Sequence, residues 1–175
     1  MDHSLTLRRA RPSDLKAVDL LLRRSYPRLL KPDYPPSVMV LALPIIARAR
    51  PELLASGRYF VVQGEDGVIL GAGGWSMGAP QTPVVTAWEE ETGMGHVRHV
   101  AVDPDRVRGG VGRAIMSEVI VDALRHRVRW LDCLSTRTAV PFYEALGFRV
   151  LHDVEVGLAP GIAFPAIRMM RQISP

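Results

Sequence analysis

The chain has 175 residues, 47% of them hydrophobic, and a formal net charge of +4 at pH 7. This length and composition are typical of one globular domain, here expected to cover residues 1–175, and they exclude fibrous and disordered chains. The longest apolar region, Val38 to Ala49, is interrupted by Pro44 and Arg48 and is too short to cross a bilayer.

The positive charge is almost entirely arginine, since Lys16 and Lys31 are the only lysines. The arginines are spread along the chain without interleaved aromatic residues, a pattern that does not favour a nucleic-acid-binding surface. Cys133 is the only cysteine, so no internal disulfide is possible, and the N-terminal residues do not resemble a signal peptide. We therefore expect a cytoplasmic protein that binds neither membranes nor nucleic acid.

Hydrophobic periodicity and turn signals predict an alternation of strands and helices. In chain order, they predict a strand at 5–9, a helix from Ser13 or Asp14 to Tyr26, a helical region at 37–55 with Pro44 and Pro51 as breaks or kinks, and strands at 59–63 and 68–75. A polar connection at 78–95, a strand at 96–102, a helix at 114–127, a strand at 129–134, a helix at 138–146, and strands at 148–157 and 164–171 follow. This order predicts an α/β (α+β) fold with a sheet of mixed direction.

Two details of these elements are informative. The helix at 114–127 has an apolar face that is expected to pack on the sheet, formed by Val111, Ile115, Val119, Ala123 and Leu124. The acidic run Glu89-Glu90-Glu91 lies in the polar connection and is expected to be a solvated loop.

A glycine-rich basic turn lies between the strand at 96–102 and the next helix. Its sequence is Arg106-Val107-Arg108-Gly109-Gly110-Val111-Gly112-Arg113. Glycines let the backbone approach an anion closely, and the first N–H groups of a helix have no intrahelical partner. The helix dipole and the arginines add positive charge at the same place. The turn therefore predicts a phosphate or pyrophosphate site.

Two common phosphate-binding motifs fit this turn poorly. A P-loop needs a lysine after its second glycine, and the chain has no lysine beyond Lys31. A dinucleotide-binding turn needs a third glycine where this chain has Ile115.

Two separate stretches resemble motifs of the GNAT N-acetyltransferase superfamily. The stretch from Val100 to Met116 is similar to the acetyl-CoA-binding motif, which reads Gln/Arg-x-x-Gly-x-Gly/Ala. The stretch from Ala139 to Phe148, with Phe142-Tyr143 at its centre, resembles the C-terminal signature Ala-x-x-Phe-Tyr-x-x-x-Gly-Phe. The two occur in the family's order, and the resemblance is strongest over residues 96–150.

The chain departs from the family pattern at two positions. Val107 stands where the family has Gln or Arg, so Arg106 or Arg108 is expected to supply that contact. Thr136 stands where the family often has Asn, and its hydroxyl offers fewer hydrogen-bonding groups than an amide.

The resemblance implies the GNAT fold, a mixed and mostly antiparallel sheet of about seven strands flanked by about four helices. It also implies that the strand at 96–102 splays from its neighbour, and that acetyl-CoA (coenzyme A) lies in the gap. The residues expected to contact this cofactor are Val100, Ala101, Val102, Arg106, Val107, Arg108, Gly109, Gly110, Val111, Gly112, Arg113, Thr136, Phe142 and Tyr143.

The implied reaction is acetyl transfer to an amine, by direct attack in a ternary complex. Tyr143 is the candidate acid for the departing thiolate, because the tyrosine of this signature often lies near the cofactor sulfur. His96 is the candidate base, with Glu89 to Glu91 as alternatives. His99, three residues beyond His96, is expected on the opposite face of the strand.

The acceptor is expected near residues 25–38 and 157–164, by analogy with the family. Trp75 and Trp88 either line its pocket or serve packing. Cys133 is expected to be a buried small residue, and no metal site is expected. A homodimer is compatible with the sequence. The alternative function is a non-catalytic coenzyme A-binding regulatory module, and an arginine-rich nucleic-acid binder is a more distant one.

Overall fold

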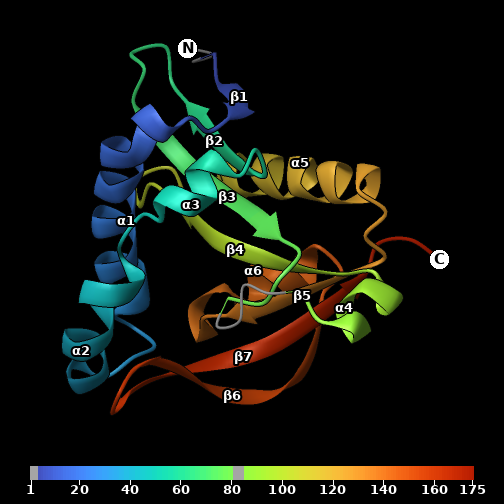
Figure 1. Ribbon diagram of the computed structural model, residues 1–175. Helices are drawn as coiled ribbons and strands as arrows, with labels where there is room; N and C mark the ends of the chain where they lie inside the picture. Colours follow the sequence, from blue (N-terminus) through green and yellow to red (C-terminus); the bar gives the residue numbers. More distant parts are fainter. Residues whose placement is uncertain (1–3, 81–84) are drawn as a thin grey trace.

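The computed structural model describes residues 4–80 and 85–175, so residues 1–3 and part of the expected 78–95 connection lie outside it. One sheet runs through the molecule in the order β1-β2-β3-β4-β5-β7-β6 (Figure 1). Its strands are β1 Thr6–Arg9, β2 Tyr59–Gln63, β3 Ile69–Ser76, β4 Met94–Val102, β5 Trp130–Ser135, β6 Arg149–Ala159 and β7 Ile162–Gln172. Only β4 and β5 pair in parallel among these strands; the other neighbours are antiparallel.

The predicted fold class is confirmed, with more helices than expected. The described chain has six α-helices: α1 Leu15–Leu30, α2 Pro36–Ile46, α3 Pro51–Ala55, α4 Ala87–Thr92, α5 Val111–Arg125 and α6 Val140–Ala145. Short 3₁₀ turns, η1 Pro12–Asp14 and η2 Arg137–Ala139, precede α1 and α6. No helix in residues 4–80 or 85–175 is both long and apolar enough to span a bilayer.

The prediction that α1 ends at Tyr26 was wrong, because the helix continues through Pro27 to Leu30. A proline inside a helix removes one hydrogen bond, but burial of neighbouring side chains can outweigh that loss. Leu22, Ser25 and Leu30 are all buried on the inner face of α1. Pro44 likewise lies inside α2, whereas Pro51 begins α3 as expected.

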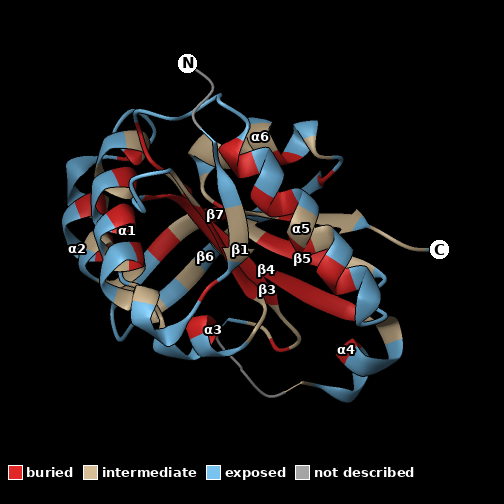
Figure 2. Cartoon of the chain, turned by 90° about the horizontal axis from the view of Figure 1, so that it is seen from above, coloured by how far each residue is buried: buried red, intermediate tan, exposed pale blue. Residues whose placement is uncertain are grey.

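Helices cover both faces of the sheet, and the interior strands are buried on both sides (Figure 2). On one face, α1 packs with Tyr59 and Val61 of β2. On the other face, α5 packs with Phe60 and Val62 of the same strand. Alternate residues of a strand point to opposite faces, so a run of apolar residues serves both layers.

Glycines in β3 allow α5 to lie close to the sheet. A Cβ atom at Gly71 would lie 2.4 Å from Val111 Cγ1 and 2.8 Å from Ile115 Cδ1. The predicted apolar face of α5 is confirmed apart from Leu124, which is 40% exposed. The helix begins at Val111, three residues before the predicted start. This shift brings Val111 and Gly112 into the first turn of the helix, directly after the glycine-rich turn.

The prediction of a solvated loop at Glu89–Glu91 was wrong for Glu89. The segment forms α4, and Thr86 and Glu89 cap each other at its start: the Glu89 N–H donates to Thr86 Oγ1, and the Thr86 N–H donates to the Glu89 carboxylate. Such a reciprocal cap is a known start signal of helices. Glu89 is 6% exposed, so its carboxylate faces the interior and not the solvent.

Candidate active site

A pocket of about 1180 Å³ lies at the point where β4 separates from β5. The two strands pair only from Met94 to His96 on β4 and from Trp130 to Asp132 on β5. Beyond these residues the edge of β4 that faces β5 has no strand partner in the described chain. Backbone groups that lack a ladder partner are available to a ligand. The predicted splay of this strand is therefore present.

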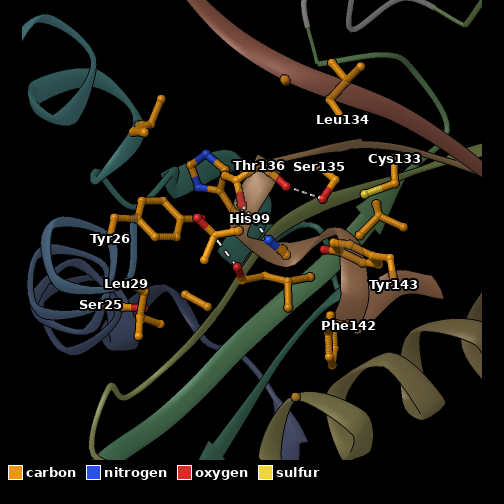
Figure 3. Close-up of a pocket in the computed structure, with 18 of the residues that line it drawn as sticks. Ser25, Tyr26, Leu29, His99, Cys133, Leu134, Ser135, Thr136, Phe142 and Tyr143 are labelled. Atoms are coloured by element: carbon orange, nitrogen blue, oxygen red, sulfur yellow. Dashed lines mark hydrogen bonds between the residues drawn. The ribbon is translucent and has the colours of Figure 1, made fainter. Parts of the chain in front are cut away.

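A bulge in β4 shapes the wall of the pocket. Between the pairs Ala72–Ala101 and Gly74–Arg98, β3 contributes one residue and β4 contributes two. His99 takes a φ of +46°, an unusual conformation for a residue with a side chain. The Tyr59 hydroxyl donates a hydrogen bond of 2.8 Å to the His99 carbonyl and so holds the bulge in place. Bulges of this kind re-aim side chains, and His99 lines the pocket (Figure 3).

One end of the pocket is formed by the N-terminus of α5. Gly110 is the N-cap residue, with a φ of +83°, and no side chain caps the helix. Within the described residues, the backbone N–H groups of Val111, Gly112 and Arg113 donate no hydrogen bond, whereas Ala114 N–H bonds to the Gly110 carbonyl. Three free donors at the positive end of a 15-residue helix form a suitable anion site.

Ion pairs hold the loop before α5 against α1. Arg24 lies 3.1 Å from the nearly buried Asp103 carboxylate, and Arg28 lies 2.8 Å from Asp105. The Asp103 N–H also donates to the Leu70 carbonyl of β3. The loop that leads into the anion site is therefore fixed on both sides.

Most of the residues predicted to contact the cofactor line this pocket. They are Val100, Ala101, Val102, Val107, Arg108, Gly110, Gly112, Arg113, Thr136, Phe142 and Tyr143. Arg106, Gly109 and Val111 are not among the residues that line it, and the Val111 side chain is buried in the core. Thr136 also caps η2, since its hydroxyl oxygen accepts a hydrogen bond from the Ala139 N–H.

Gly112 and Phe142 pack against each other where α5 meets α6. A Cβ atom at Gly112 would lie 3.1 Å from Phe142 Cε2 and 3.3 Å from Val102 Cγ2. The two resembling stretches of sequence therefore meet in space at this glycine. Phe142 in turn makes an edge-to-face contact with Tyr143, with ring centroids 5.1 Å apart.

Tyr143 lines the middle of the pocket beside Cys133 and opposite Tyr26 (Figure 3). Burial and the neighbouring Cys133 thiol raise the pKa of Tyr143 well above its ordinary value. The hydroxyl therefore keeps its proton at neutral pH. Burial also raises the pKa of Cys133 to about 12, so this buried cysteine is not an activated nucleophile.

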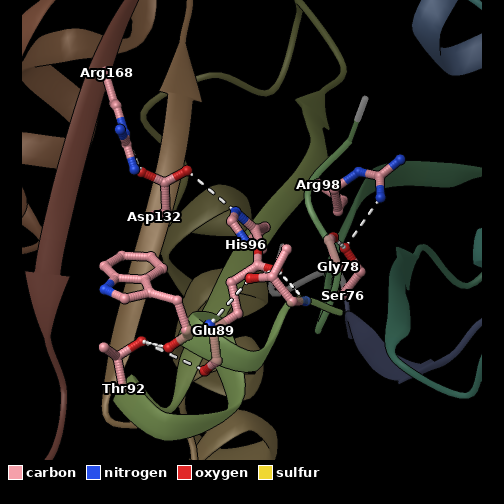
Figure 4. Close-up of polar contacts among 10 residues, drawn as sticks. Ser76, Gly78, Glu89, Thr92, His96, Arg98, Asp132 and Arg168 are labelled. Atoms are coloured by element: carbon pink, nitrogen blue, oxygen red, sulfur yellow. Dashed lines mark hydrogen bonds and ion pairs between the residues drawn. The ribbon is translucent and has the colours of Figure 1, made fainter. Parts of the chain in front are cut away.

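His96 lies outside the pocket lining, within a polar cluster in which Glu89, His96 and Asp132 are buried and Arg168 is half-buried (Figure 4). Its Nε2 atom is 2.7 Å from Glu89 Oε1, and its Nδ1 atom is 3.1 Å from Asp132 Oδ2. Arg168 donates to the other oxygen of Asp132. Burial tends to raise the pKa of both carboxyl groups, but hydrogen bonds from Thr86 and His96 to Glu89, and from His96 and Arg168 to Asp132, lower it below the ordinary value. The cluster sits on the last paired residues before β4 and β5 separate.

The pocket is also lined by residues that the sequence patterns did not identify. They are Ser25, Arg50, Glu52, Arg98 and His99. The Ser25 hydroxyl is buried and has no hydrogen-bond partner among the described residues. Burial, together with Arg98 and Arg50, lowers the pKa of His99 to about 4, so this ring is neutral at pH 7. No motif indicates these residues, because they come from three separate segments.

The remaining candidates from the sequence have other roles in the structure. Trp75 is fully buried in the core and Trp88 is 56% exposed, so neither lines the pocket. The expected acceptor segments do reach the pocket, through Leu29 and Leu30 on one side and Gly157 and Leu158 on the other. In residues 4–80 and 85–175, no group of three or more His, Cys, Asp or Glu side chains is arranged to hold a metal ion.

Comparison with known proteins agrees with this geometry. A sequence model described as an acetyltransferase (GNAT) domain matches residues 55–150, more than half of the chain. No curated protein sequence matches the chain significantly.

Several solved structures share the fold. One is a GCN5-related N-acetyltransferase from Rhodopseudomonas palustris, with 18% identity, a TM-score of 0.72 and 98% coverage of both chains. Another is the PaiA N-acetyltransferase from Thermoplasma acidophilum in complex with coenzyme A, with 13% identity, a TM-score of 0.69, and coverage of 97% of this chain and 99% of that one. A third is the ribosomal-protein-S18-alanine N-acetyltransferase from Escherichia coli, with 19% identity, a TM-score of 0.63, and coverage of 98% and 96%.

The splayed sheet and the uncapped N-terminus of α5 are features of an acyltransferase fold. The match to the acetyltransferase domain model identifies the family. The chain belongs to the GNAT acetyltransferase family. The resemblance seen in the two sequence motifs is thus confirmed.

Proposed function

We propose that this protein is an acetyl-CoA-dependent N-acetyltransferase that moves the acetyl group to an amine by direct attack in a ternary complex. One observation carries the proposal. A single pocket brings together the free N–H groups of α5, the unpaired edge of β4 and the Tyr143 hydroxyl. These are the elements that hold a long phosphorylated thioester and protonate its leaving group.

The residues present fit acetyl-CoA, which supplies the acetyl group as a thioester when bound. The diphosphate matches the free N–H groups of Val111, Gly112 and Arg113, with Arg108 and Arg113 adding charge. The backbone of Val100 and Val102 is available for strand-like hydrogen bonds with the pantetheine arm. The coenzyme A complex of the PaiA N-acetyltransferase supports the same choice of cofactor.

Tyr143 is proposed to give its proton to the departing thiolate. In the transfer a nitrogen–carbon bond forms, the carbon–sulfur bond breaks, and the sulfur needs a proton. An alkyl thiol such as that of cysteine has an ordinary pKa of about 8.5, so a positioned acid assists departure of the thiolate. The raised pKa of Tyr143 keeps this proton available across the neutral range.

The attacking amine must lose its own proton, and a free alkylamine has a pKa of about 10.4. Burial is the largest cause of the lowered pKa of His99, and the same desolvation favours the neutral form of an amine bound beside it. His96 stays the predicted base, although both of its ring nitrogens are occupied by carboxylates.

The test is the variant Tyr143→Phe, assayed by coenzyme A release with a panel of amines. We expect kcat to fall about a hundredfold, while the affinity for coenzyme A and the melting temperature stay close to those of the original protein. Full turnover in this variant would show that Tyr143 does not give a proton to the departing thiolate. Tight coenzyme A binding without turnover of any amine by the original protein would instead favour a non-catalytic coenzyme A-binding module.

A further inference from the structure

Two arginines outside the glycine-rich turn line the same pocket. Arg50 precedes α3, and Arg98 lies on β4 directly before the bulge. Both line the pocket and both are partly buried. Burial and, to a smaller extent, the positive charge of Arg50 lower the pKa of Arg98.

Within the described residues, these two side chains have few polar partners. Arg98 donates a single side-chain hydrogen bond there, of 3.0 Å, to Ser76 Oγ (Figure 4). The Arg50 side chain makes no hydrogen bond or ion pair within the described residues. Glu52 lines the same pocket and raises the pKa of Arg98 slightly, but no ion pair of 4 Å or less joins it to either arginine in the described part of the chain. Two partly buried guanidinium groups with so few partners are suited to an anion.

This anion is not the diphosphate of the cofactor. The glycine-rich turn follows the end of β4 at Val102, and Arg98 lies four residues earlier. At about 3.3 Å per residue, the two positions are roughly 13 Å apart along the strand. The arginines therefore flank the part of the pocket that the acceptor occupies if the proposed function is correct.

We propose that Arg50 and Arg98 bind the carboxylate of the acceptor, so that this enzyme acetylates amines that carry a carboxylate group, such as amino acids. The inference rests on the proposed function. A guanidinium group presents its donors in a planar fork that matches a carboxylate. The Ser25 hydroxyl, which has no hydrogen-bond partner among the described residues, lines the same pocket and can donate a further hydrogen bond.

The test compares matched pairs of acceptors, each an amino acid and its carboxamide, for example glycine and glycinamide. We expect kcat/KM for the best amino acid to exceed that for its amide by at least about tenfold, as a charged hydrogen bond provides. In Arg98→Gln and Arg50→Gln this ratio is expected to fall toward one, mainly through KM for the amino acid. Equal or faster turnover of the amides, or an unchanged ratio in both variants, would overturn the proposal.

Two control variants separate the charge from the fold. Arg48→Gln removes an exposed arginine two residues from Arg50 that does not line this pocket, and should leave the ratio unchanged. Ser76→Ala removes the one hydrogen bond of the Arg98 side chain but leaves its charge, and should retain most of the preference. Melting temperatures of all four variants identify any that fail to fold.

A binding experiment keeps this inference distinct from the proposed function. N-acetylglycine and N-acetylglycinamide are titrated into the protein while the His99 ring is followed by NMR. A carboxylate beside Arg50 and Arg98 screens their charges and should raise the His99 pKa above about 4. N-acetylglycinamide should leave the His99 pKa unchanged, and neither ligand should raise it in Arg98→Gln. If no amine is acetylated, the proposed function fails, and this binding experiment still tests whether Arg50 and Arg98 bind a carboxylate. Equal changes in the His99 pKa with the two ligands would reject the carboxylate site.

Discussion

The two ends of the pocket are built in different ways. The cofactor end uses main-chain groups from one continuous stretch, the end of β4 and the start of α5. The end proposed for the acceptor uses side chains from separate segments, with Arg50 before α3 and with Arg98 and His99 on β4. Main-chain donors are set by the backbone conformation, whereas a side-chain site changes with each substitution. One scaffold can thus keep its cofactor while its acceptor varies.

The largest expected effect concerns both ends of the pocket, because the cluster around His96 lies at the point where β4 and β5 separate. His96→Gln removes the ring whose two nitrogens lie within hydrogen-bond distance of the buried Glu89 and Asp132 carboxylates. A buried charged group that loses its hydrogen-bond partner costs about 1–3 kcal/mol or more, so we expect the free energy of unfolding to fall by about 3 kcal/mol in urea denaturation, with weaker coenzyme A binding.

His152→Gln is the matched control for that measurement, because His152 is exposed on β6. Unchanged stability of His96→Gln together with a large loss of kcat at neutral and alkaline pH would support His96 as the catalytic base.

A second change addresses the cofactor end alone. Arg113→Ala removes a charge, and Arg113→Pro removes both the charge and the free N–H group at the third position of α5. Proline is tolerated in the first turn of a helix. We expect coenzyme A affinity to fall a few-fold for alanine and about a hundredfold for proline, measured by calorimetry. Equal affinities of the two variants would show that this amide does not bind the cofactor.

The smallest expected effect belongs to the acceptor end and is a pH dependence. A histidine in the unfolded chain protonates near pH 6.5, whereas His99 in the folded protein protonates only at about pH 4. The unfolded state therefore binds more protons between these values, and stability falls as the pH drops through this window. His99→Asn should reduce this loss by about 2 kcal/mol, measured as the difference in unfolding free energy between pH 7 and pH 4. An identical loss in the variant would show that His99 is not desolvated.

Much of the fold and of the cofactor end could be predicted from the sequence. β2 lies at the residues predicted from its apolar run, and the glycine-rich turn lies between a strand and a helix as expected. Such features depend on neighbours in the chain, namely on side-chain periodicity and glycine backbone freedom. The end of α1 was missed, because burial of Leu22 and Leu30 outweighs the local effect of Pro27. Glu89 was misjudged because an acidic run is usually solvated, and here its partner His96 comes from another element.

The sequence by itself determined the family and the anion-binding turn, since both depend on contiguous residues whose backbone behaviour is local. The tertiary structure alone decided which of two nearby histidines enters the pocket. The bulge in β4 places His99 in the pocket that Arg50 and Arg98 also line, while parallel pairing with β5 holds His96 against Asp132. The physical reason is that charge and desolvation depend on distance through space, and residues far apart in the chain set those distances.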